Sequence, residues 1–158
     1  MSLLSCANGQ SAWRGYHYYL DRKVQSVKRV GSTQFQGTVS GSNGETYDVF
    51  IDVEHPRKSS CTCPHAAGKR IVCKHRIALL FSAFPLDAKK YYEEVVKYEQ
   101  ERLQEEEENK VIDCVDNMTK EHLQRALLQV LFDGSEWQYD KFIREYVDSK
   151  PYEEDPEE

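Results

Sequence analysis

Four residues of the kinds that hold metal ions lie close together near the middle of the chain. One residue separates Cys61 from Cys63, and one residue separates Cys73 from His75. In an extended segment, residues two apart point to the same side, so each pair can offer two ligand atoms to one point. Three thiolates and one imidazole are a tetrahedral ligand set for Zn²⁺. The pattern C-x-C-x9-C-x-H therefore predicts a zinc site.

The predicted site is structural in character. Four protein ligands leave no coordination position for water, which is the arrangement of a structural zinc ion rather than a catalytic one. The nine residues from Pro64 to Val72 include Gly68 and are long enough to fold back on themselves. Because metal binding supplies much of the stability of small zinc domains, we predict that residues 45–84 need zinc to fold.

Other interpretations of these residues stay open. His65 lies inside the stretch and could replace His75 as the fourth ligand. The cysteines could instead be a redox pair or a chance cluster, although a disulfide between Cys61 and Cys63 would close a strained ring. We interpret the remaining cysteines and histidines as ordinary surface or core residues: Cys6, Cys114, His17, His55 and His122.

Sequence patterns of common zinc enzymes do not occur in the chain. None of its five histidines is followed two places later by Glu, as a zinc deaminase requires. There is no H-E-x-x-H pattern and no phosphate-binding loop. Zinc would also occupy both members of a Cys73–His75 nucleophilic pair. We therefore expect a binding module, not an enzyme, and no small-molecule substrate.

Charge is divided unevenly along the chain. Residues 11–90 contain 13 Lys and Arg against 6 Asp and Glu, whereas residues 91–158 contain 8 against 21. A basic surface suits nucleic acid, whose phosphates attract cations without regard to base sequence. The predicted nucleic-acid contacts are the cations around the zinc site: Arg57, Lys58, Lys69, Arg70, Lys74 and Arg76.

The apolar segments predict no contact with a membrane. Runs such as 77–81 are far shorter than the ~20 residues that cross a bilayer. The first residues lack the basic segment and the long apolar stretch of an export signal. We therefore expect an intracellular protein, in the cytoplasm or in a eukaryotic nucleus, where cysteines serve as metal ligands more often than as disulfides.

The elements that must position the zinc ligands indicate an α+β fold. An aromatic-rich helix is predicted over 11–21, followed by a three-stranded antiparallel sheet with strands at 22–30, 33–40 and 45–53, where apolar residues alternate. Asn43-Gly44 is typical of a hairpin turn. A helix is expected from His75 to Phe84, with Ile77, Leu80, Phe81 and Phe84 on one face. Sheet and helix would together form a zinc-bound β-β-α knuckle.

The sequence of residues 87–148 predicts an acidic helical appendage. A long helix is expected over 87–109, frayed at the acidic run 105–108, and two shorter helices are expected after Thr119 and Ser135. The apolar faces at 123–131 and 142–147 would pack on each other, pack on the zinc unit or bind a partner protein. The acidic segment could also cover the basic half. Residues 1–10 and 149–158 are predicted to be disordered tails.

The segment 11–84 resembles the SWIM-type zinc finger. The resemblance is carried by Arg14-Gly15-x-x-Tyr18, Cys61-Thr-Cys63-Pro64 and Cys73-Lys74-His75, and Met118-Thr-Lys-Glu-x-Leu123 looks like the helical appendage that often follows this finger. The resemblance to this family implies a small zinc unit that binds DNA or other proteins. We therefore predict a domain at 11–84 that binds zinc and, through its basic face, nucleic acid. The alternative is a protein-interaction adaptor within a larger assembly.

Overall fold

The computed structural model describes residues 2–149 and divides the chain into two compact units. The first unit runs to Tyr98 and the second begins at Glu99, so helix α3 (Pro85–Asp116) contributes to both. The prediction placed this boundary at 84–87. The structure places it later because the first turns of α3 still pack on the core, where Ala88 is buried and the Tyr91 ring lies 5.3 Å from the Phe81 ring.

The first unit contains a four-stranded antiparallel sheet in the order β1-β2-β3-β4. Three of its strands were predicted: β1 (Val24–Arg29), β2 (Gln34–Ser40) and β3 (Thr46–Asp52). The fourth, β4 (Ser60–Cys61), corrects the prediction of three strands. A strand of two residues is too short to show an alternating pattern, and it exists because Cys61 pairs with Val49 of β3.

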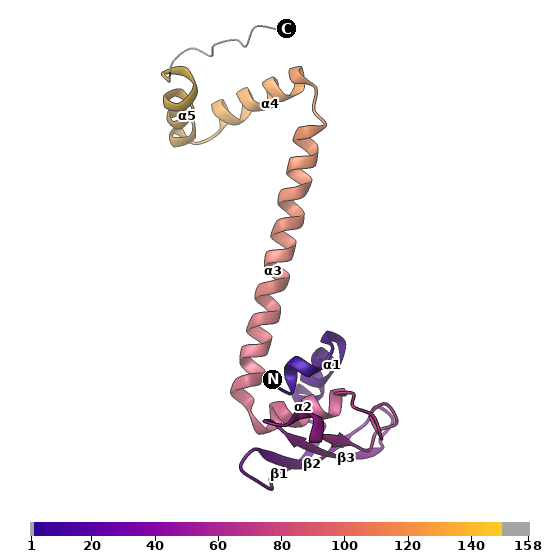
Figure 1. The fold of residues 1–158 in the computed structure, drawn as a ribbon. Helices are drawn as coiled ribbons and strands as arrows, with labels where there is room; N and C mark the ends of the chain where they lie inside the picture. The colour runs from indigo at the N-terminus through magenta and orange to yellow at the C-terminus, as the bar shows by residue number, and fades with distance from the viewer. Residues whose placement is uncertain (1, 150–158) are drawn as a thin grey trace, which may run out of the picture. The chain divides into compact units, whose positions relative to one another are not determined.

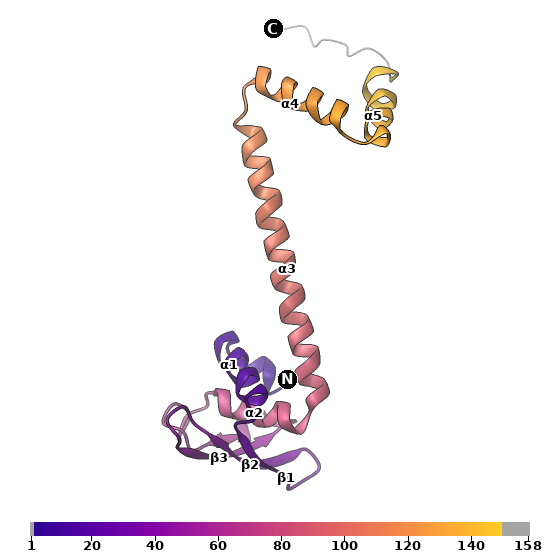
Figure 2. The same ribbon diagram turned by 180° about the vertical axis from the view of Figure 1, so that it is seen from behind.

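Two helices cover one face of this sheet in layers (Figures 1 and 2). Helix α2 (Lys74–Ala83) packs on the strands, and helix α1 (Gly9–Leu20) packs on α2. The predicted apolar face of α2 is confirmed, since Ile77 and Phe81 are fully buried. Because α2 lies between the sheet and α1, Ala78 and Leu79 are fully buried as well, and α2 is the centre of the core.

The contact between α1 and α2 depends on Gly15. A Cβ atom at this position would lie 2.5 Å from Cβ of Ile77 and 2.9 Å from the carbonyl oxygen of Lys74. Real Cβ atoms do not approach other atoms so closely, and the Lys74 oxygen belongs to the backbone. The absence of a side chain at Gly15 therefore sets the distance between the two helices.

The start of the chain is ordered, contrary to the prediction of a disordered segment over 1–10. A 3₁₀ helix covers Leu4–Cys6, and Asn8 caps α1 by accepting a hydrogen bond from the Ser11 N–H at 2.7 Å. Leu3 is only 1% exposed and belongs to the core. Leu3, with Leu4 and Ala7 packed beside it on the core, thus anchors a segment that is otherwise small and polar. Of the predicted tail at 149–158, residues 150–158 lie outside the described part of the chain.

A buried carboxylate fixes the segment between β3 and β4. Asp52 is 1% exposed and accepts hydrogen bonds from the side-chain amide of Gln34 and from the backbone N–H of His55, each at 2.9 Å. These donors, with the Gln34 amide contributing most, lower the pKa of Asp52 to about 2. The short helix η2 (Pro56–Lys58) follows, and the backbone N–H of Asp52 donates to the hydroxyl of Ser59 at 3.0 Å. The network thereby directs the chain back to the sheet at Cys61.

The second unit is built from the remainder of α3, helix α4 (Lys120–Asp133), helix α5 (Glu136–Phe142) and a π-helical turn at Ile143–Val147. Both predicted caps are present: the Thr119 side chain accepts from the His122 N–H, and Ser135 and Gln138 form a capping box. Helix α3 continues through the acidic run 105–108, where fraying was predicted. Arg102 pairs there with Glu99 and Glu106 on the same helix face, which offsets part of the repulsion between like charges.

The apolar faces of the second unit remain largely exposed. Among its described residues only Leu131 is buried, while Leu123 and Leu127 are about two-fifths exposed. Other large apolar side chains there are more exposed still: Val111, Ile112, Leu128, Val130, Phe132, Trp137, Tyr146 and Val147. None of the helices within residues 2–149 combines the length and the apolar character needed to cross a membrane.

Candidate metal centre

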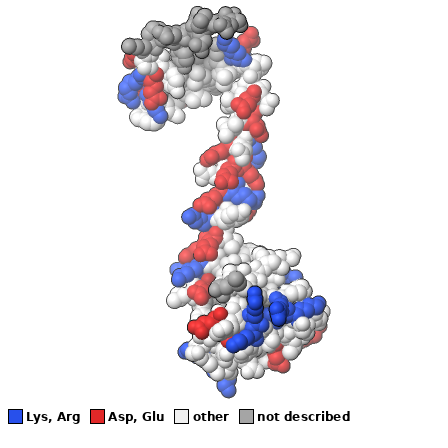
Figure 3. All heavy atoms as spheres, viewed as in Figure 1, with Lys and Arg blue, Asp and Glu red and all other residues white. Residues whose placement is uncertain are grey.

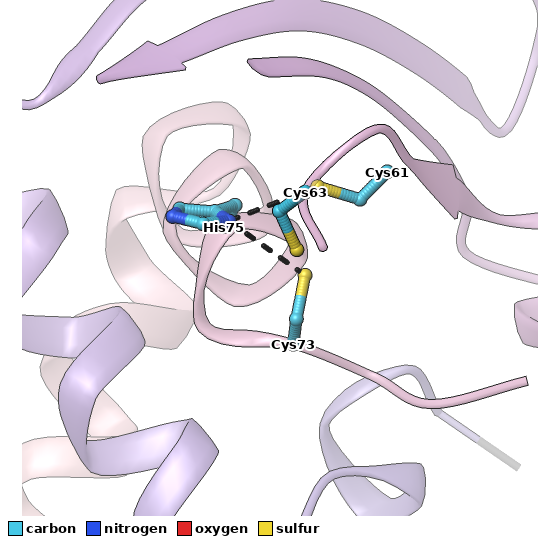
Figure 4. A group of neighbouring side chains, drawn as sticks. All are labelled: Cys61, Cys63, Cys73 and His75. Carbon is cyan, nitrogen blue, oxygen red and sulfur yellow. Dashed lines mark hydrogen bonds between the residues drawn. The ribbon is translucent and has the colours of Figure 1, made fainter. Parts of the chain in front are cut away.

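The four predicted ligands converge beside the end of β4 and the start of α2 (Figure 4). Cys61 ends β4 and Cys63 follows it, Cys73 is the N-cap residue of α2, and His75 lies in the first turn of that helix. All four side chains are buried, with exposed fractions of 2–4%. The edge strand β4 and the start of α2 thus bring the two ligand pairs together.

The distances fit one zinc ion. The four candidate ligand atoms lie within 4.8 Å of one another. Nδ1 of His75 is 3.7 Å from Sγ of Cys61 and 4.0 Å from Sγ of Cys73. With Zn–S near 2.3 Å and Zn–N near 2.0 Å, the edges of a tetrahedron are about 3.5–3.8 Å. The ligand atoms are therefore arranged as a buried Cys₃His zinc site requires, and a small contraction would complete it.

The backbone around the ligands is held by the sheet and by the helix. Thr62, between the two cysteines, donates its N–H to the carbonyl oxygen of Asp48 at 3.1 Å and accepts the Asp48 N–H on its hydroxyl at 3.0 Å. The N–H groups of Ala66 and Ala67 donate to the carbonyl oxygen of Cys63 at 3.0 and 2.8 Å. This turn starts the return of the chain toward Cys73.

The thiols are electrostatically unequal while no metal is bound. A hydrogen bond with the Cys61 thiol, assisted by His75 and by the backbone N–H of Arg76, lowers the pKa of Cys73 to about 3. The same sulfur–sulfur hydrogen bond, together with burial, raises the pKa of Cys61. A bound zinc ion would take the place of the shared proton, because coordinated thiols are deprotonated. Zinc affinity should therefore fall as pH falls and protons compete for the sulfurs.

Aromatic rings pack around the histidine ligand. The ring of Tyr47 lies 4.8 Å and the ring of Tyr18 lies 5.5 Å from the imidazole of His75, measured between centroids. These contacts orient Nδ1 toward the sulfurs. Nε2 of His75 is buried and has no hydrogen-bond partner among the described residues. Sequence reasoning did not assign Tyr18 or Tyr47 to the site, since an aromatic residue in a helix or strand is typical of any core.

The alternatives left open by the sequence are now decided. His65 is exposed and lies outside the ligand cluster, so His75 is the histidine ligand. Cys6 and Cys114 are exposed, and no disulfide occurs among the cysteines of the described residues. A chance cluster does not account for four buried ligand atoms that face one point.

The predicted basic contacts fall into three groups. Four are exposed: Arg57, Lys58, Lys69 and Arg70. Lys74 is half-buried, and its ammonium lies 4.3 Å from the centre of the Tyr18 ring. Arg76 was predicted wrongly, because α2 is enclosed on nearly every side and leaves this residue 3% exposed. Figure 3 shows Lys and Arg side chains gathered on one face of the first unit.

Fold and site together define a small α+β zinc finger with a Cys₃His centre. Comparison with protein families makes this specific: residues 47–84 match the model of the SWIM zinc finger. This part of the chain is a SWIM zinc finger, a binding module, with Cys61, Cys63, Cys73 and His75 in the ligand positions. Searches of curated proteins and of solved structures give no match.

Proposed function

We propose that the zinc finger binds nucleic acid through exposed cations on the loop that its zinc ion closes. Lys69 and Arg70 lie between the two ligand pairs and are exposed, and Arg57 and Lys58 are exposed on η2 just before them. The first unit carries 14 Lys and Arg against 8 Asp and Glu, a balance of +6. Cations on a loop held by a metal ion meet phosphates without a large ordering cost, which supports this function.

The test is fluorescence anisotropy with labelled double-stranded DNA, single-stranded DNA and single-stranded RNA at about 50 and 200 mM salt. We expect the zinc-loaded full chain to bind at least one of them, more weakly at the higher salt. Lys69→Ala with Arg70→Ala should lower the slope of log affinity against log salt by about 2, one for each lost phosphate contact.

The matched control is Lys110→Ala with Lys120→Ala, which removes the same charge from exposed positions of the second unit. This variant should keep the wild-type affinity and salt slope. If no nucleic acid binds at low salt, or if both double variants bind alike, the proposed function is wrong.

We infer a second function for the second unit, which is to dock a basic, amphipathic segment of another protein. Between residues 99 and 149 the chain carries 14 Asp and Glu against 6 Lys and Arg, a balance of −8. The apolar face of α4 at Leu123 and Leu127, and Trp137 on α5, are exposed within this acidic surface. The apolar stripe of such a partner would cover the exposed apolar side chains, and its basic flanks would pair with the acidic residues around them.

Trp137 provides the measurement, because it is 65% exposed and Trp13 is the other tryptophan of the chain. In a Trp13→Phe chain, we expect a basic amphipathic helical peptide to shift the Trp137 fluorescence to shorter wavelength. An acidic peptide with the same apolar residues should leave the spectrum unchanged. Leu127→Asp should abolish the shift and Gln124→Asp, exposed on the same helix, should not.

Sedimentation over a range of concentrations completes this test. If the chain self-associates without peptide and Trp137 becomes buried, a second copy of the chain covers the apolar face of the second unit. If the basic and the acidic peptide shift the Trp137 fluorescence equally, the acidic surface does not select a basic partner. Either result overturns the docking of a basic partner.

A further inference from the structure

A cavity of about 350 Å³ adjoins the zinc centre in the first unit. Its wall is formed by the first turns of α1, the turn between β2 and β3, the ligand loop and the start of α2. Besides zinc ligands, the lining includes Gln10, Ser11, Arg14, Ser42, Tyr47 and Lys74. A zinc ion would fill only the part between the ligand atoms, which already lie within 4.8 Å of one another. The remaining volume, at the lower end of the range for small-ligand pockets, is open to another group.

The lining has the chemistry of an anion site. Arg14 and Lys74 are its cationic members, and none of the lining residues is Asp or Glu. Hydroxyl and amide groups of Ser11, Ser42 and Gln10 add neutral hydrogen-bond donors. Such a set of donors around a concave space binds oxyanions and rejects cations.

One of the cations is held in place. The ammonium of Lys74 lies 4.3 Å from the centre of the Tyr18 ring, and the ammonium of Lys23 lies 4.6 Å from the same ring. A lysine restrained by a cation–π contact loses less rotamer freedom when it meets a ligand. Lys74 also lies between the candidate ligands Cys73 and His75, so a bound zinc ion would restrain its backbone.

The charge of the metal centre decides what kind of anion fits. Three thiolates and one Zn²⁺ sum to −1, and Arg14 with Lys74 sum to +2, which leaves +1 for the cavity and its metal together. That balance matches a monoanion and disfavours a dianion. A phosphodiester is a monoanion, and the half-buried ring of Tyr47 provides an apolar wall for the sugar beside it.

We propose that this cavity binds one phosphodiester of a nucleic-acid strand, with Arg14 and Lys74 as its charged contacts. The proposal rests on the nucleic-acid function proposed above and assigns to it a specific phosphate site, separate from the exposed cations Lys69 and Arg70. Arg14 lies on α1, outside the stretch that carries the ligands, so its proximity to Lys74 follows from the packing of α1 on α2.

The experiment compares three zinc-loaded full-length variants in the anisotropy assay. Arg14→Gln and Lys74→Gln should each lower nucleic-acid affinity about tenfold, as expected for a lost charged hydrogen bond, and reduce the salt slope by about 1. Lys28→Gln, which removes the same charge from an exposed position on β1, should bind as the wild type does. Arg14 is exposed, so its variant should keep the wild-type zinc content and melting temperature.

A titration followed by NMR locates the anion directly. Dimethyl phosphate, a monoanionic phosphodiester, should shift the amide signals of Gln10, Ser11, Ser42 and Lys74, and inorganic phosphate should shift them less at equal concentration. These shifts should disappear in Arg14→Gln. Shifts confined to Lys69 and Arg70 would overturn the assignment.

The two proposals fail in distinguishable ways. If Arg14→Gln and Lys74→Gln bind nucleic acid normally while Lys69→Ala with Arg70→Ala does not, the cavity is not a phosphate site and the nucleic-acid function stands. If the wild-type chain binds no nucleic acid, both proposals are overturned.

Discussion

Cys63→Ser is expected to abolish zinc binding and to remove the cooperative thermal unfolding transition of the first unit. The Cys63 side chain is 2% exposed and stands with the other three ligand atoms around one point. Apparent zinc-binding energies of small zinc domains are about 10–16 kcal/mol, as large as the whole stability of a typical domain, about 5–15 kcal/mol. Without zinc, the three buried sulfurs and the buried imidazole would face one another with no metal charge to balance the thiolates, or would have to share protons.

Two measurements check this expectation. Native mass spectrometry should find one zinc ion for each wild-type chain and none for Cys63→Ser, and circular dichroism should show that a chelator reproduces the effect of the substitution on the melt. Because β4 and the start of α2 carry the ligands, hydrogen exchange should increase first there and in the paired strand β3.

Cys6→Ser and Cys114→Ser are the matched controls, since these cysteines are exposed and lie outside the cluster. Both should keep the zinc ion and the wild-type melting temperature. A Cys63→Ser chain that melts as the wild type does would show that the ligand cluster does not stabilise the fold, and zinc content that falls equally in all three variants would show that the site is elsewhere.

Gly15→Ala is expected to destabilise the first unit by about 1–3 kcal/mol, the usual cost of overpacking a core. The added Cβ would lie 2.5 Å from Cβ of Ile77 and 2.9 Å from the backbone oxygen of Lys74. Neither contact can be relieved by turning a flexible side chain, so α1 and α2 must move apart. Because Lys74 lies between Cys73 and His75, the same shift should weaken zinc binding.

Gly9→Ala is the control for this change. Gly9 begins the same helix, and a Cβ atom there would have no other atom within 4 Å. Alanine should be neutral or slightly stabilising at Gly9, because it restricts the unfolded chain. The readouts are the melting temperature and the zinc affinity measured by competition with a chelating dye. Equal values for the two alanine variants would contradict the close approach of α1 to α2.

The two units differ in how much of their apolar surface they bury. The first has a core centred on α2 and a metal centre, and its exposed groups include the cations of the ligand loop. The second buries little within its described residues, so its apolar helix faces stay largely exposed. Binding of nucleic acid by one and of a basic protein segment by the other would make the chain an adaptor, which the proposed assays test separately.

The sequence alone determined the zinc site and the order of the main elements. Ligand types and spacing are local properties, so C-x-C-x9-C-x-H identified Cys61, Cys63, Cys73 and His75 without knowledge of the fold. Alternation in β2 and β3, periodicity in α2 and the caps at Thr119 and Ser135 are equally local, and the structure bears these out. The alternation predicted for the first strand is not borne out, because β1 is exposed along nearly its whole length. Each of these signals depends on neighbours within a few residues.

Only the tertiary structure decided the features that depend on distant parts of the chain. Pairing with β3 makes a strand of Ser60–Cys61, and enclosure of α2 buries Arg76 although its sequence neighbours are basic. Packing orders the segment around Leu3, and the close contact at Gly15 brings α1 and Arg14 to the cavity beside the metal centre. Burial and proximity arise from contacts between segments far apart in sequence, which no local pattern of residues encodes.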